Sequence, residues 1–196
     1  GKLGARRLAA RTFVNATNLP RGKMDTEDWE RVVRGASYIA QKNNVYTDTT
    51  AGQTVQEVKS KCKKLKIKNG LDVVVIDHLG LITPTNSKEN RVNQISEITR
   101  NIKIMAKELD VAVIVLSQLS RAPEQRTDHR PILSDLRDSG TIEQDADLIM
   151  LLYRDEYYNK DTKEKGILEC TIGKQRDGKT GTINLAYLPQ YQKISD

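Results

Sequence analysis

The sequence predicts an α/β fold: a mostly parallel sheet flanked by helices, with an antiparallel hairpin at one edge. Two β-branched runs, Val73–Ile76 and Val111–Leu116, are typical of parallel strands covered on both faces. Helix-patterned segments precede both runs, and this alternating order indicates right-handed crossover connections. Two alternating runs, 167–174 and 182–188, flank the turn pair Asp177-Gly178 and predict the hairpin.

Local signals place the elements in order along the chain. Asp25 begins a helix, because it is a preferred N-cap residue followed by an acidic first turn, and Thr54 caps the next helix. Apolar residues recur at helical spacing from Val92 to Leu109, which predicts an amphipathic helix. In chain order we expect helix 2–17, helix 25–43, strand 45–48, helix 54–68, strand 73–77, helix 89–109, strand 111–116, a buried strand 148–153 and the hairpin 167–188.

Composition narrows the class of protein. A chain of 196 residues has the length of a single domain. No apolar run reaches the roughly 20 residues that cross a membrane, and residues 1–20 lack a signal-peptide stretch, so we expect a cytoplasmic protein without a membrane partner. Residues 1–70 hold 15 Lys and Arg against 6 Asp and Glu. This basic surface could face nucleic acid, an acidic neighbouring subunit or water alone, and we favour water.

Polar residues close the two β-branched runs. Asp77 follows the first run and Gln118 follows the second. In open α/β sheets, ligands bind at the carboxyl ends of the parallel strands. An aspartate there can hold Mg²⁺, and a glutamine on the neighbouring strand can sense the γ-phosphate of a nucleotide. The alternative is that Asp77 only caps a turn.

Residues 173–180 match the phosphate-loop pattern G-x-x-x-x-G-K-[ST] letter for letter. A working phosphate loop needs a helix after it, because the amides at the helix N-terminus hold the phosphates. Residues 182–188 alternate like a strand, so we interpret the match as a hairpin tip with Lys174 and Arg176 pointing outward. No other segment matches, and the chain therefore lacks a phosphate cradle in this interpretation.

Five sequence blocks occur in one order along the chain: Val73–Asp77, Ser117–Arg121, Ser134–Asp147, Tyr153–Glu156 and Gly173–Arg176. Together they closely resemble the RecA-like ATPase domain of DnaB-family replicative helicases, a family with phage-encoded members. The resemblance covers nearly the whole chain and implies a single RecA-like domain over residues 1–196. Block 134–147 is its most specific part, whereas the strand that ends in Asp77 is shared with many phosphate-loop ATPases.

The resemblance implies ATP and Mg²⁺ as cofactors and gives roles to four residues. Asp77 resembles the Walker B aspartate that supports Mg²⁺, and Gln118 resembles the γ-phosphate sensor that couples nucleotide state to the DNA side. Arg176 resembles the arginine finger that reaches a neighbouring subunit's ATP, with Lys174 assisting. Such a finger stabilises the charge that develops on the transferred phosphoryl group.

The resemblance also implies contact with single-stranded DNA through a central loop. Gly140 can present a bare backbone amide to a phosphate, and Arg137 adds positive charge; the alternative is that Arg137 pairs only with Asp135 or Asp138. Aromatic residues make up 5% of the chain, which favours tracking of the DNA backbone over base stacking. The expected DNA-contacting residues are Arg137, Asp138, Ser139 and Gly140.

Family members carry a glycine-rich phosphate loop and a strand with a catalytic glutamate ahead of the segment at which this chain starts. We therefore expect a domain that is truncated on its N-terminal side and inactive alone. In the intact protein we expect a hexameric helicase moving 5′ to 3′ on single-stranded DNA, with primase and a helicase loader as further partners. The alternatives are a RecA-type recombinase or clock-type ATPase, and a DNA-binding or subunit-interface module without catalysis.

Overall fold

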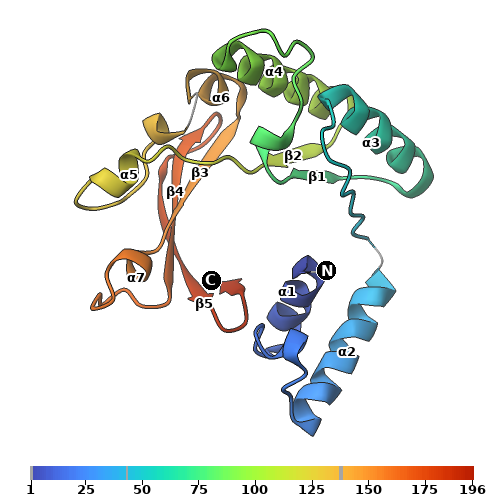
Figure 1. Cartoon of the computed structure of the whole chain (residues 1–196), viewed down its shortest axis with the longest axis vertical. Helices are drawn as coiled ribbons and strands as arrows, with labels where there is room; N and C mark the ends of the chain where they lie inside the picture. The colour runs from blue at the N-terminus through green and yellow to red at the C-terminus, as the bar shows by residue number, and fades with distance from the viewer. Residues whose placement is uncertain (1, 43, 137–138) are drawn as a thin grey trace. The chain divides into compact units, whose positions relative to one another are not determined.

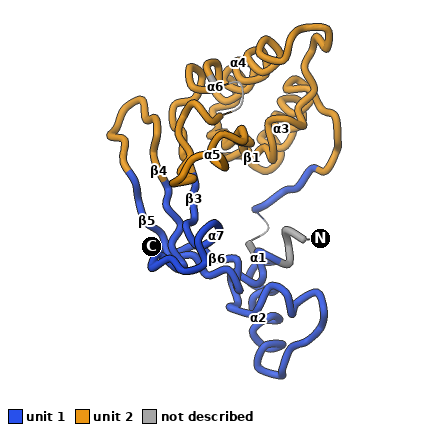
Figure 2. The backbone as a smooth tube through the Cα atoms, turned by 60° about the vertical axis from the view of Figure 1, so that its left-hand side comes forward, with its two compact units in different colours: residues 1–48, 152–170, 182–196 blue, residues 49–151, 171–181 orange. Residues whose placement is uncertain are grey.

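The computed structural model describes residues 2–42, 44–136 and 139–196 (Figure 1). The chain divides into two compact units, which Figure 2 shows in blue and orange. Unit 1 comprises residues 1–48, 152–170 and 182–196, and unit 2 comprises residues 49–151 and 171–181. Within the described ranges, no helix is long and apolar enough to cross a membrane.

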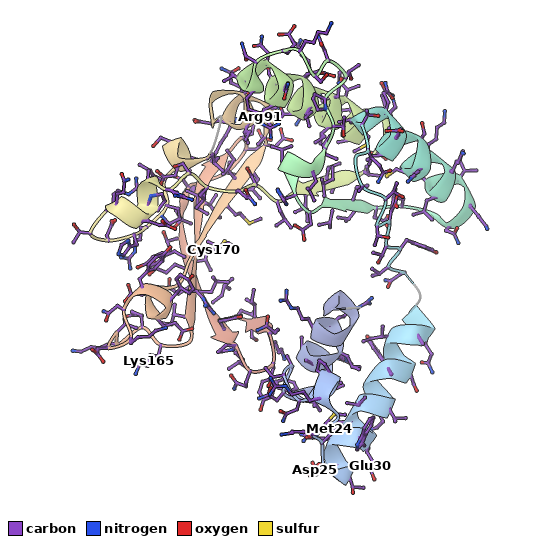
Figure 3. All side chains as sticks on the ribbon, viewed as in Figure 1. Met24, Asp25, Glu30, Arg91, Lys165 and Cys170 are labelled. Atoms are coloured by element: carbon purple, nitrogen blue, oxygen red, sulfur yellow. The ribbon has the colours of Figure 1, made fainter. Side chains whose placement is uncertain are left out.

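Unit 1 contains the first two long helices, α1 (Lys2–Thr12) and α2 (Thr26–Lys42), which pack against each other. Helix α1 ends five residues before the predicted boundary, because Phe13 has a φ of 55°, in the left-handed region that ends a helix. Helix α2 begins where the sequence predicts: the Asp25 side chain lies at its amino end (Figure 3) and its Oδ1 accepts the Asp28 amide at 2.7 Å.

The two long helices of unit 2 begin at or close to their predicted starts. Helix α3 (Val55–Asn69) follows a capping box in which the Thr54 amide donates to Glu57 Oε2 at 2.8 Å and the Glu57 amide donates to Thr54 Oγ1 at 3.3 Å. Helix α4 (Arg91–Leu109) is capped by Asn90. Its buried residues are Ile95, Ile98, Ile102, Met105 and Leu109, which form the centre of the unit 2 core.

A two-stranded parallel sheet packs on these helices. Strand β1 (Val73–Ile76) pairs with β2 (Ala112–Val115) in a register that aligns Val73 with Ala112 and Ile76 with Val115. One face joins the core of α3 and α4, whereas Val75 on the other face is 61% exposed. The prediction that both faces are covered is therefore wrong for the described residues, because side chains alternate between faces and these helices lie on one of them.

A second sheet has the strand order β3-β4-β5-β6. The strand predicted at 148–153 is present as β3 (Leu148–Tyr153), but only its alternate positions are buried. Strands β4 (Ile167–Gln175) and β5 (Gly181–Leu188) lie side by side and confirm the predicted hairpin (Figure 1). Strand β6 (Lys193–Ser195), which pairs antiparallel with β5, was not predicted. The α/β class is confirmed, but its strands belong to separate sheets.

The remaining short elements lie between these strands and helices. The predicted strand 45–48 is wrong, since this exposed segment has no regular secondary structure. Strand propensity forms a strand only where packing and a neighbouring strand support it. The short helices are η1 (Leu19–Arg21), η2 (Leu79–Leu81), α5 (Ala122–Gln125), η3 (Leu133–Asp135), α6 (Ser139–Asp145) and α7 (Asp155–Tyr158).

Candidate functional site

Strands β1 and β2 bring Asp77 and Gln118 to the same edge of their sheet. Asp77 directly follows β1, and the ladder continues past the strand ends, where the Leu116 amide donates to the Ile76 carbonyl at 3.0 Å. Gln118 lies two residues further along the β2 chain. The prediction that Asp77 and Gln118 follow the carboxyl ends of two neighbouring parallel strands is confirmed.

Both polar side chains at this edge are open to ligands. Asp77 and Gln118 are exposed, and within residues 44–136 and 139–196 no hydrogen bond or ion pair occupies the Asp77 carboxylate or the Gln118 amide group. A pocket of about 510 Å³ is lined by Gln118, Leu119, Ser120 and Arg121. Carboxylate oxygens are donors that Mg²⁺ prefers, so the open Asp77 carboxylate is compatible with a magnesium ligand.

The segment after Gln118 is tied to the residues that precede the predicted DNA-contacting loop. Leu119 and Leu136 form an isolated antiparallel bridge, and the Ser120 amide donates to the Asp135 carbonyl at 2.7 Å. The segment that follows Gln118 and the start of the loop are therefore joined by main-chain contacts.

The predicted loop itself is described only in part. Arg137 and Asp138 lie outside the described residues, and of Ser139 only the backbone is described, as the first residue of α6. Gly140 is exposed, and a Cβ added to it would meet no atom within 4 Å. Nothing in the described part of the chain therefore blocks access of a phosphate to the Gly140 backbone.

Asp135, the carboxylate beside this loop, has a partner that sequence reasoning missed. Its side chain is 2% exposed, forms a two-point ion pair with Arg126 and accepts the Ile132 amide at 2.7 Å. The hydrogen bonds from Arg126 lower the pKa of Asp135. Because Asp135 is buried and Arg126 is partly exposed, loss of Arg126 would leave a buried carboxylate without its cation, so the pair helps to hold the loop 126–135 in place. No sequence signal marked Arg126, because the loop has no periodic pattern.

The segment that matches the phosphate-loop pattern is a strand, a turn and a second strand. Residues 173–175 end β4, and β5 begins at Gly181, so the helix that a phosphate loop requires is replaced by a strand. The hairpin interpretation is confirmed. Packing explains the first glycine of the pattern, because a Cβ on Gly173 would lie 2.9 Å from Leu133 Cδ2.

Lys174 and Arg176 have different surroundings on this hairpin. The prediction that both point outward is wrong for Lys174, which is half-buried and donates from its amine to the Glu143 carbonyl in α6. Arg176 is 53% exposed, its amide donates to the Asp147 carbonyl at 2.9 Å, and its Nη1 lies 3.1 Å from Asp147 Oδ1. The guanidinium therefore stays accessible while one edge of it is held.

Asp147 is a second residue that sequence reasoning missed. Its Oδ2 pairs with Lys103 of α4, and its Oδ1 faces Arg176. The hydrogen bond from Lys103, with the positive charges of Arg176 and Lys174, lowers the pKa of the Asp147 carboxyl. The sequence marked Asp147 as the last residue of the block 134–147. It gave no sign that Asp147 pairs with Lys103 and Arg176, which are distant in the sequence.

The hairpin geometry makes a prediction for nucleotide binding. A fluorescent ATP analogue with Mg²⁺ should show no binding to this chain that depends on Lys179, because Lys179 is exposed on the turn and the segment after it is a strand instead of a helix. Titration of the chain and of Lys179→Ala measures this dependence. Binding that disappears with Lys179 would restore residues 173–180 as a phosphate loop.

Comparisons with known proteins identify the fold and the family. The family model of the DnaB-like helicase C terminal domain matches residues 1–196. The chain is 47% identical over 194 residues to the replicative DNA helicase DnaB of Geobacillus stearothermophilus and 46% identical to the replicative DNA helicase DnaC of Bacillus subtilis (strain 168), covering 98% of this chain each time. It spans 42% of the length of each of these curated relatives.

Solved structures agree with this result. A DnaB-like replicative helicase, described with its interactions with primase, superposes with a TM-score of 0.92 at 44% identity, covering 97% of this chain and 46% of that one. A second solved structure, described as an ATPase domain, superposes with a TM-score of 0.91 at 44% identity, covering 97% of this chain and 68% of that one. The predicted RecA-like fold is thus confirmed, and the chain belongs to the DnaB-like helicase C-terminal domain family.

Proposed function

We propose that this chain is part of the motor of a replicative DNA helicase, which couples ATP hydrolysis between subunits of a hexameric ring to 5′ to 3′ movement on single-stranded DNA. The observation that carries the proposal is the position of Arg176. It lies directly after β4 with an accessible guanidinium, whereas Asp77 and Gln118 lie at the edge of the other sheet. A cation on a hairpin tip is suited to reach a neighbouring subunit's nucleotide.

On the nucleotide side, each residue has a separate task. Asp77 holds Mg²⁺ through its open carboxylate, and Gln118 contacts the γ-phosphate from the neighbouring strand end. When bound, Mg²⁺ neutralises charge that develops on the phosphate oxygens. Arg176 places its positive charge beside the transferred phosphoryl group of the adjacent subunit, while Lys174 anchors β4 to α6. Residues 173–180 form a hairpin, so they are not assigned to the phosphate cradle.

On the DNA side, we assign Arg137, Asp138, Ser139 and Gly140 to the backbone of the single strand. The support is the exposure of Gly140 and the main-chain link from Leu136 back to the segment that follows Gln118. Because phosphates are the same at every step of the strand, such contacts suit a motor that works on any sequence. We place this motor in the cytoplasm, with primase and a helicase loader as partners.

The DNA assignment is tested by Arg137→Ala. We expect weaker binding to single strands of every sequence alike, with a slope of log K against log salt that is smaller by about one phosphate contact. Fluorescence anisotropy on assembled rings over a salt series measures both quantities. Lys165→Ala, which removes an exposed charge from unit 1, is the matched control and should change neither.

Two outcomes would redirect the assignment. A loss restricted to particular sequences would mean that Arg137 reads bases instead of phosphates. Negative-stain images decide the assembly, since filaments in place of closed rings would favour the recombinase alternative. DNA binding that is indifferent to nucleotide would favour a module without catalysis.

A further inference from the structure

Asp147 contacts the β4–β5 hairpin through Arg176. It lies between α6 and β3. Lys103 of α4 pairs with one of its carboxylate oxygens, and Arg176 of the hairpin pairs with the other. The Arg176 amide also donates to the Asp147 carbonyl at 2.9 Å. Asp147 therefore engages both the main chain and the side chain of Arg176.

Hydrogen bonds made by neighbouring residues hold the segment around Asp147 in place without a bound nucleotide. Two residues earlier, Asp145 Oδ2 accepts the Thr99 hydroxyl of α4 at 2.5 Å. Lys174, on the same strand as the hairpin, donates to the Glu143 carbonyl of α6. Helix α6 is thus attached to α4 on one side and to β4 on the other, and Asp147 follows its end.

The pair with Arg176 is suited to orientation and contributes little to stability. Arg176 and Asp147 remain 53% and 57% exposed, and ion pairs at that exposure contribute little to folding. A guanidinium presents five donors in a rigid fork. Because Nη1 faces the Asp147 carboxylate at 3.1 Å, the remaining donors stay available to phosphate oxygens, and the torsions of a long side chain are restricted in advance.

Lys103 limits how strongly the Asp147 carboxylate holds Arg176. A lone carboxylate would hold Arg176 strongly and compete with a phosphate for it. The Asp147 carboxylate already pairs with Lys103 through its other oxygen, so its charge is shared between two cations. The guanidinium is therefore oriented without being neutralised by one partner alone.

We propose that Asp147, supported by Lys103, is a positioning residue that orients the Arg176 guanidinium toward the nucleotide of the adjacent subunit. The proposal rests on the proposed function, because it takes Arg176 as the group that acts across the subunit boundary. Asp147 itself touches no nucleotide and acts only through Arg176. Its removal should therefore lower the rate of the chemical step and leave nucleotide affinity unchanged.

The test is steady-state ATP hydrolysis by the full protein assembled as a ring, with saturating single-stranded DNA. We expect Asp147→Asn to lower kcat about ten- to a hundredfold, the range for a misplaced catalytic group, with an unchanged KM for ATP. Asp147→Glu keeps the charge and should recover part of the lost turnover. Thermal unfolding and ring assembly should match the unsubstituted protein, because the side chain is more than half exposed.

Asp145→Asn is the matched control. It makes the same change of charge two residues away, on a carboxylate that bonds Thr99, and an asparagine can still accept that hydroxyl. Its turnover should equal that of the unsubstituted protein. If it falls as far as that of Asp147→Asn, the effect belongs to the charge of this surface and the positioning role is overturned.

The remaining outcomes separate the inference from the proposed function. Unchanged turnover in Arg176→Ala would remove the arginine finger and the proposed function with it. A large loss in Arg176→Ala together with normal turnover in Asp147→Asn would overturn the positioning role alone. Weaker nucleotide binding or failed assembly in Asp147→Asn would show that Asp147 maintains the fold, and would likewise overturn it.

Discussion

Arg176→Ala is expected to abolish ATP turnover in the assembled ring and to leave nucleotide binding intact. The guanidinium lies on a hairpin tip, and in the proposed function it contacts the nucleotide of a neighbouring subunit, whereas Asp77 and Gln118 of its own subunit are assigned to a different nucleotide. An arginine supplied to a phosphoryl-transfer site contributes about 10³- to 10⁵-fold to kcat, because it stabilises charge that is largest in the transition state. Ground-state binding depends on it much less.

The measurement combines single-turnover hydrolysis with titration of a fluorescent ATP analogue on the same ring preparation. Lys179→Ala removes another positive charge from the same hairpin and should retain full turnover, since Lys179 is exposed on the turn beyond Arg176. Loss of analogue binding in Arg176→Ala would mean that this arginine binds the nucleotide in its ground state. The subunit-bridging role would then be wrong.

Asp77→Asn is expected to reduce Mg²⁺-dependent turnover by about 10²-fold or more, because the ion stabilises several kcal/mol of transition-state charge and the neutral amide holds it poorly. The carboxylate follows β1 directly and is open to solvent. A Mg²⁺ titration of the hydrolysis rate should show a weaker apparent affinity for the ion. If turnover is lost because the ion binds more weakly, the difference in turnover between Asp77→Asn and the unsubstituted ring should become smaller as the Mg²⁺ concentration increases.

Asp72→Asn is the matched control for this substitution. Asp72 is an exposed aspartate immediately before β1, at the opposite end of the strand, and its contribution to the sheet comes from its backbone carbonyl, which accepts the Ala112 amide at 2.9 Å. Turnover should be unchanged. Equal rates in Asp77→Asn and the unsubstituted ring would exclude Asp77 from the magnesium site.

The positions of Asp77 and Gln118 were predictable because they depend on one short-range pattern and one general rule. Runs of β-branched residues mark the strands, and parallel strands bring their carboxyl ends to one edge. The hairpin at 173–180 was predictable for a similar reason, since alternation after Gly181 is incompatible with a helix. Each of these predictions depends only on residues that are close together in the sequence.

The contacts of Asp135 and Asp147 were not predictable in this way. Asp147 pairs with Lys103, 44 positions away, and with Arg176 beyond β3 and β4. Asp135 pairs with Arg126 across a loop that has no periodicity. The end of α1 was missed because Phe13 adopts a left-handed conformation without being glycine, and strand β6 was missed because three residues hold too little pattern.

The contact between Gly173 and Leu133 changes how the phosphate-loop match should be interpreted in related sequences. The glycine is favoured by the bulk of a leucine on a neighbouring segment, since a methyl group added at position 173 would lie 2.9 Å from Leu133 Cδ2 and would displace that side chain. A relative with a smaller residue at position 133 has room for alanine at position 173. Such a relative would lose the motif and keep the hairpin, so the two positions are expected to vary together.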